Sequence, residues 1–183
     1  MTSPSPARST WAIDPDHSTV QFSLQYMGIG VFSARFHSIN GAIAANETDP
    51  IDSSVTVSMP VESVDVRNKT LYDWLLAKDF FNHEQHPEIT FRSTDLERVE
   101  ASRWHVNGAL AIAGRTCPVV LDTVYLGQVH HPFAERIMAA FTAETTIKRS
   151  DFGLGWNMPL ASGTPALGEH VNVKIYITSF RQD

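Results

Sequence analysis

The sequence predicts an all-β fold in which eight strands form an antiparallel barrel, with a short helical insertion between strands 3 and 4. Apolar residues alternate at a period of two along most of the chain, which is typical of strands with one face turned toward a core. The 183 residues, of which 43% are hydrophobic, are enough for one sizeable core. Closing the sheet removes the two exposed edges that eight strands would otherwise leave.

The expected strands follow one another along the chain and are joined mostly by short turns. The first begins at Val20, and the third stops at Pro60 because proline has no N–H to donate to a sheet. Seven of the eight expected strands cover residues 20–26, 32–41, 55–60, 105–112, 119–124, 137–147 and 171–177, and the fourth strand opens with Ile89 and Phe91. A barrel of eight strands can be filled by its own side chains or can hold one small ligand, so the count permits a cavity without requiring one.

The helical insertion is expected between Pro60 and Pro87. Asn68 can cap a helix on which Leu71, Trp74 and Leu75 form an apolar stripe. Such a helix must bury its stripe against the barrel or against a ligand. We therefore expect it to cover one mouth of the barrel.

A second interruption, between Arg149 and Glu169, contains four glycines and two prolines and is long for a connection in a compact domain. We interpret it as a flap. Arg149 is expected to latch it, either by pairing with a carboxylate or by stacking on an aromatic ring such as Trp11.

Composition and charge exclude several classes of function. The net charge of −6, with no basic stripe, argues against a nucleic-acid partner, and no apolar run is long enough to span a membrane. Residues 1–10 are expected to form a disordered tail, followed by a single domain over residues 11–183. Because the tail lacks the apolar core of a secretory signal, we expect a cytoplasmic location.

No motif predicts catalysis or a metal site. His83 and His86 are three residues apart, which is not the spacing of the zinc-binding His-Glu-x-x-His motif. The single Cys117 enters an apolar strand, where a thiol behaves as a small hydrophobic group. We therefore expect no catalytic residue, no metal and no cofactor.

His17 lies in a cluster of turn-forming residues just before the first expected strand. It can belong to an Asx-type turn built on Asp14, or it can lie at a barrel mouth and bind the polar head of a ligand. Ten Phe, four Tyr and four Trp also fit two interpretations, an ordinary packed core or an aromatic-lined tunnel.

Five motifs, in the same order and at the same intervals, resemble the YceI-like family of polyisoprenoid-binding proteins, and the resemblance runs from about Trp11 to Arg181. The motifs are Ile13-Asp14-Pro15-Asp16-His17-Ser18, Lys78-Asp79-Phe80-Phe81, Pro87-Glu88-Ile89-Thr90-Phe91, Gly114-Arg115-Thr116-Cys117-Pro118-Val119 and Arg149-Ser150-Asp151-Phe152-Gly153. The resemblance implies a lipocalin-like barrel that holds a long isoprenoid chain, such as a quinone tail, in an apolar tunnel.

The segment before the second motif departs from the family pattern. The family usually shows Arg-Asp-x-His-Leu, whereas this chain has Tyr72 in place of the Arg and Leu75 in place of the His. The substitutions imply a more apolar cover over the tunnel.

The resemblance leads to the hypothesis of a non-enzymatic protein that carries or sequesters a polyisoprenoid or similar long-chain lipid. Two alternatives remain: a hydrolase or isomerase that uses His residues around a cavity, and a stress or interaction module with a packed interior. A homodimer is compatible with each. The residues expected to bind the ligand are Phe22, Phe36, Phe91, Leu110, Phe141, Val173 and Ile175 on the tunnel wall and Trp74, Phe80 and Phe81 at its cover, with His17 and Arg149 at the mouth or latch.

Overall fold

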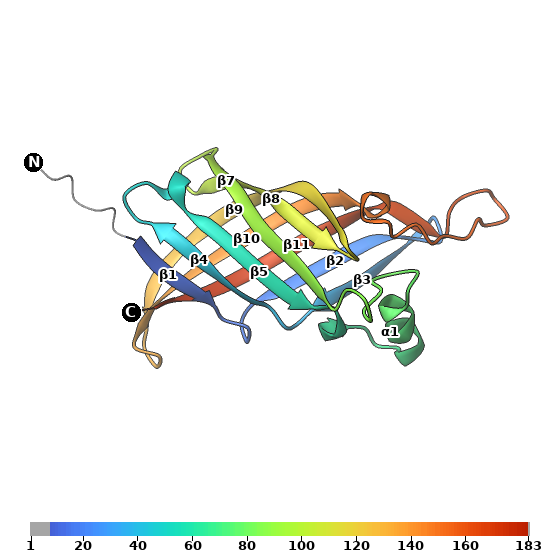
Figure 1. Cartoon of the computed structure of the whole chain (residues 1–183), viewed down its shortest axis with the longest axis horizontal. Coiled ribbons are helices and arrows are strands. Elements are labelled where there is room, and N and C mark those ends of the chain that lie inside the picture. Colours follow the sequence, from blue (N-terminus) through green and yellow to red (C-terminus); the bar gives the residue numbers. More distant parts are fainter. Residues whose placement is uncertain (1–7, 183) are drawn as a thin grey trace, which may run out of the picture.

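The computed structural model describes residues 8–182, which form one closed antiparallel barrel with a helix at one end (Figure 1). The helix α1 spans Lys69–Leu76, and three 3₁₀ turns span Pro50–Asp52, Val61–Ser63 and Arg149–Phe152. The strands are β1 Arg8–Ile13, β2 Thr19–Tyr26, β3 Gly30–Phe36, β4 Asn40–Asn46, β5 Ser54–Pro60, β6 Val64–Asp65, β7 Glu88–Arg98, β8 Arg103–Ile112, β9 Arg115–His131, β10 Arg136–Lys148 and β11 Leu167–Gln182.

These segments make an eight-stranded barrel because three of the barrel strands are interrupted. β1 and β2 both pair with β11, β2 along its first part and β1 along its last four residues. In the same way β3 and β4 form one barrel strand, and β5 and β6 form the next. Pairing of β1 with both β4 and β11 closes the ring, which confirms the predicted fold class.

The interior is built by the alternation seen in the sequence. Near α1 the aromatic rings pack on one another: Phe22 stacks on Phe36 with ring centroids 5.6 Å apart, and Phe81 meets both rings edge-on. Position 108 faces inward in β8 and is occupied by glycine. The ring of Phe91 lies against it, and a Cβ atom there would collide with that ring. These rings narrow the interior near α1 and border a cavity that continues along the barrel.

The helix α1 begins as predicted. The Asn68 side chain accepts the Leu71 N–H, and Lys69 pairs with Asp73 one turn later on the exposed face. Leu75 is buried against the core, so the apolar stripe holds the helix on the barrel. The insertion therefore lies between the third and fourth barrel strands, as expected.

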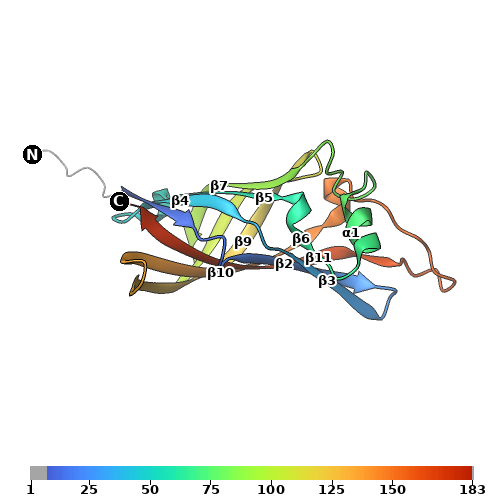
Figure 2. The ribbon, with the colours of Figure 1, turned by 90° about the horizontal axis from the view of Figure 1, so that it is seen from below.

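The two ends of the barrel differ. Figures 1 and 2 both show α1, the β2–β3 turn and the loop before β11 at one end, and the first and last described strands meeting at the other. We call these the α1 end and the termini end. The flap (residues 149–166) belongs to the α1 end, where Met27 of the β2–β3 turn donates its N–H to the Ala166 carbonyl at 2.7 Å.

Two expectations about segments need correction. Residues 8–10, expected in the tail, belong to β1, where Trp11 and Ile13 alternate inward and the strand pairs on both sides; residues 1–7 of the expected tail lie outside the described part. The first barrel strand therefore begins before Val20. His130 and His131 continue β9 beyond the expected strand, and the His131 ring accepts backbone N–H groups of the following turn.

Candidate functional site: an apolar cavity through the barrel

A cavity of about 1250 Å³ runs along the inside of the barrel. Pockets for drug-sized ligands span roughly 300–1,000 Å³, so this one suits a larger molecule. Its lining follows β11 from Leu167 to Arg181, which at about 3.3 Å per residue is on the order of 45 Å along the strand. The space is therefore long as well as large.

All ten residues predicted for the wall and its cover line this cavity. Phe91, Leu110, Phe141, Val173 and Ile175 come from four different strands, and their side chains face the same lumen because each occupies an inward position of its strand. Phe22, Phe36, Phe80, Phe81 and Trp74 line the part nearest α1. Their contact with a ligand stays a prediction.

The cover at the α1 end joins the helix to the flap. Phe80, just after α1, packs on Trp156 of the flap with ring centroids 5.5 Å apart. Trp74 borders the cavity but remains 56% exposed, so the helix covers the opening without sealing it. Phe81 lies deeper, within the aromatic cluster of the core.

The sequence did not assign the aromatic residues at the termini end to the cavity wall. Trp11, Trp104 and Tyr125 line the cavity there, and Tyr125 packs on Phe141 at 5.3 Å. The alternation of the apolar residues Trp11 and Ile13 with their neighbours is the pattern that indicates β1. A β-bulge in β9 facing Ala140 shifts the register near Tyr125, and simple alternation does not reveal such a shift.

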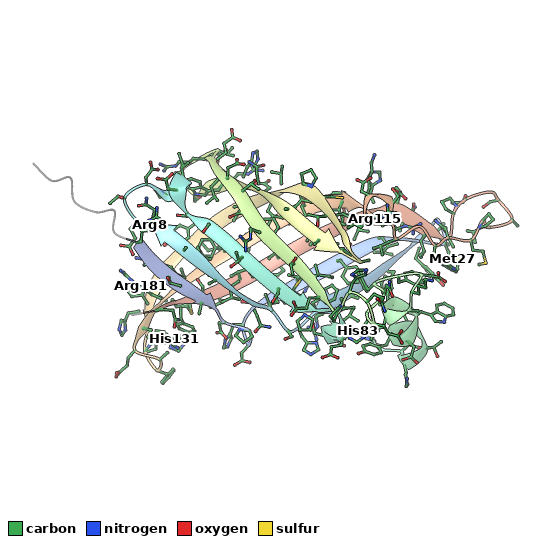
Figure 3. All side chains as sticks on the ribbon, in the orientation of Figure 1. Arg8, Met27, His83, Arg115, His131 and Arg181 are labelled. Carbon is green, nitrogen blue, oxygen red and sulfur yellow. The ribbon has the colours of Figure 1, made fainter. Side chains whose placement is uncertain are left out.

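Charged residues that line the termini end are engaged with the protein itself. Arg181 pairs with Glu47 at 3.1 Å. Arg98 lies over the Trp104 ring at 5.6 Å and donates to the carbonyls of Glu100 and Ala101. Figure 3 shows Arg181 and Arg8 at this end, with Met27 and Arg115 toward the other.

Arg149 latches the flap, but its partners differ from those expected. The side chain is 6% exposed, and the guanidinium donates to the carbonyls of Leu154 and Trp156 within the flap and of Gly168 at the start of β11. No carboxylate or aromatic ring is needed to hold the guanidinium of Arg149, because the loop turns its carbonyl groups toward the positive charge. The prediction of the latch partner was therefore wrong in its chemistry.

His17 is exposed and lies outside the cavity lining. Its Nδ1 is 2.7 Å from a carboxylate oxygen of Asp14, whose other oxygen accepts the N–H of Asp16 in an Asx turn. This geometry matches the turn interpretation of the residue.

Of the carboxyl groups in residues 8–182, two have shifted pKa values, and neither lines the cavity. The hydrogen bond that Ser150 donates lowers the pKa of Glu169 below its usual value. Arg103 lowers the pKa of Asp122 on the outer face of β8 and β9 in the same way. Both shifts belong to the surface and offer no acid or base to a cavity ligand.

Within residues 8–182, no cluster of three or more His, Cys, Asp or Glu side chains is arranged to hold a metal ion. His83 lies 3.8 Å from Glu62 instead. No helix in this part of the chain is both long and apolar enough to cross a membrane.

A closed antiparallel barrel with a long apolar cavity inside it defines the class of protein: an elongated, lipocalin-like barrel. The model of the YceI-like domain matches residues 11–179, so the chain belongs to the YceI-like family. A UPF0312 protein of Pectobacterium atrosepticum is 30% identical over 146 residues, covering 80% of this chain and 75% of the relative. Protein YceI of Escherichia coli O157:H7 gives the same identity and coverage.

Solved structures share the fold. BcnA of Burkholderia cenocepacia superposes with a TM-score of 0.76 at 20% identity, covering 91% of this chain and 98% of its own. A polyisoprenoid-binding domain from Saccharophagus degradans gives a TM-score of 0.66 at 16% identity, covering 97% and 100%. At these identities the likeness shows a common barrel.

Proposed function

We propose that this protein binds the hydrocarbon chain of a polyisoprenoid, or of a similar long-chain amphiphilic lipid such as an isoprenoid quinone, and carries or sequesters it without a cofactor and without converting it. The observation that carries the proposal is the long cavity with its almost wholly apolar wall. The name of the Saccharophagus degradans domain, which is polyisoprenoid-binding, supports the ligand class.

The wall supplies enough free energy for this role. Burying a CH₂ group contributes about 0.8 kcal/mol, so a five-carbon isoprene unit contributes about 4 kcal/mol. Three buried units contribute about 12 kcal/mol, which leaves about 8 kcal/mol, a micromolar Kd, after an association cost of about 4 kcal/mol. The length of apolar wall thus sets the affinity, and shorter chains should bind more weakly.

Organic extraction of the purified protein, followed by mass spectrometry, tests the proposal. We expect a long-chain isoprenoid lipid in a ratio approaching one per chain, and re-binding of that lipid by the emptied protein. A chemically altered product after incubation would favour the hydrolase or isomerase. Failure of emptied protein to bind polyprenyl chains of any length would favour the packed module and refute the proposal.

A further inference from the structure

The apolar wall of the cavity continues onto the protein surface at the α1 end. Among residues 8–182, five large apolar side chains are both exposed and part of the cavity lining, and all five lie at this end: Tyr26, Val31, Trp74, Trp156 and Met158. Exposed apolar residues at the termini end, such as Val129 and Phe133, do not line the cavity. An apolar chain that leaves through the α1 end therefore meets an apolar surface.

Three chain segments come together to form this surface, which we call the rim (residues 26–31, α1 with Phe80, and residues 154–160). The Met27 N–H bonds to Ala166, which ties the β2–β3 turn to the flap. The contact of Phe80 with Trp156 ties the flap to the helical insertion. At the tip of the turn Ile29 is 96% exposed, and the flap projects beyond the barrel in Figures 1 and 2.

We propose that the rim docks on the surface of a lipid bilayer, so that the ligand passes between bilayer and cavity through the α1 end. The inference rests on the proposed function, because a long isoprenoid chain has a negligible concentration free in water. The β2–β3 turn and the flap protrude separately, and a fluid lipid surface can accommodate such an uneven shape. Tryptophan and tyrosine, both present on the rim, favour the boundary between lipid and water.

Charge contributes little to this docking. Lys69 and Asp73 of α1 neutralise one another, Lys78 is followed by Asp79, and the whole chain carries a net charge of −6. A polybasic patch, which would select anionic lipid, is absent from the rim segments described above. Binding should therefore occur on zwitterionic vesicles and change little with salt.

The experiment is co-sedimentation of the whole chain, emptied of lipid, with phosphatidylcholine vesicles. We expect binding that Ile29→Ser weakens about tenfold, because an exposed tip loses its apolar side chain without disturbing the core. The matched control is Phe133→Ser, a side chain 92% exposed in the turn after β9 at the termini end, which should leave binding unchanged.

A second measurement locates the contact. Vesicles with brominated acyl chains should quench tryptophan fluorescence of the parent, and quenching should vanish in the Trp74→Phe, Trp156→Phe double variant, which keeps the rim apolar. Equal vesicle binding by the parent and Ile29→Ser would overturn the proposal. A second result would also overturn it: no vesicle binding, together with light scattering that shows a dimer in the parent and a monomer in Ile29→Ser. The rim would then contact a second copy of the chain.

The two proposals can fail separately. A protein that takes up a polyprenyl chain presented in detergent micelles but does not bind vesicles keeps the proposed function and loses the docking surface. A protein that binds vesicles through the rim but takes up no polyprenyl chain keeps the docking surface and loses the proposed ligand.

Discussion

Replacing Phe141 with arginine tests whether the lumen holds the ligand chain. Phe141 lines the cavity from β10 and packs on Tyr125 with ring centroids 5.3 Å apart. A guanidinium there occupies the lumen and resists losing its water, so at least one isoprene unit can no longer be buried. That unit is worth about 4 kcal/mol, which corresponds to a Kd roughly a thousandfold higher.

The assay is equilibrium binding of a fluorescent polyprenyl ligand by emptied protein. The control is Val120→Arg, which adds the same charge on the exposed outer face of β9 and should leave the Kd within about threefold of the parent. Circular dichroism and urea unfolding establish that both variants fold. If folded Phe141→Arg binds as tightly as Val120→Arg, the chain does not pass this point of the lumen and our reasoning is refuted.

Three further predictions concern stability. Arg149→Met should lower the free energy of unfolding by about 2–4 kcal/mol, measured in urea, because three carbonyls of the flap and β11 lose their donor. Gly108→Ala should cost about 1–3 kcal/mol, since its Cβ would lie 2.6 Å from the Arg92 carbonyl oxygen. Ser150→Ala should destabilise the protein near neutral pH, because the Glu169 carboxylate loses its hydrogen-bond donor. The difference in stability from the parent should disappear as the pH falls below 4.5 and through the lowered pKa of Glu169, because the protonated carboxyl no longer gains from that hydrogen bond.

Each stability prediction has a matched comparison. Arg67→Met removes an exposed guanidinium and should change stability by less than about 0.5 kcal/mol. Gly155→Ala adds a Cβ into open space and should likewise be nearly neutral. For Ser150→Ala, a difference from the parent that stays constant between pH 7 and pH 3 would contradict the role assigned to Glu169.

The barrel was predictable because burial on one side imposes a period of two that survives in the sequence. Phe22, Phe91, Leu110 and Phe141 stand at inward positions for that reason, and all four line the cavity. The helix was predictable because its cap is local: Asn68 and the residues it satisfies are neighbours in the chain.

The errors arose where distant partners decide the structure. β1 is short, and its partners β4 and β11 lie far away in sequence, so residues 8–10 alone carry too weak a pattern. The partners of Arg149 are backbone carbonyls, which every residue possesses and no sequence motif marks. The size of the cavity depends on how completely side chains fill the lumen, which alternation does not determine.

The closure of the barrel has a consequence for synthesis of the chain. Thr10 in β1 pairs with Gln182 in β11, so β1 cannot complete its backbone hydrogen bonds until β11 has been synthesised. During translation the growing sheet exposes an unpaired edge and an apolar inner face together, and such species aggregate readily. Contacts this remote in sequence also slow folding. The same seam that encloses the lumen thus leaves the nascent chain prone to aggregation until β11 has been synthesised.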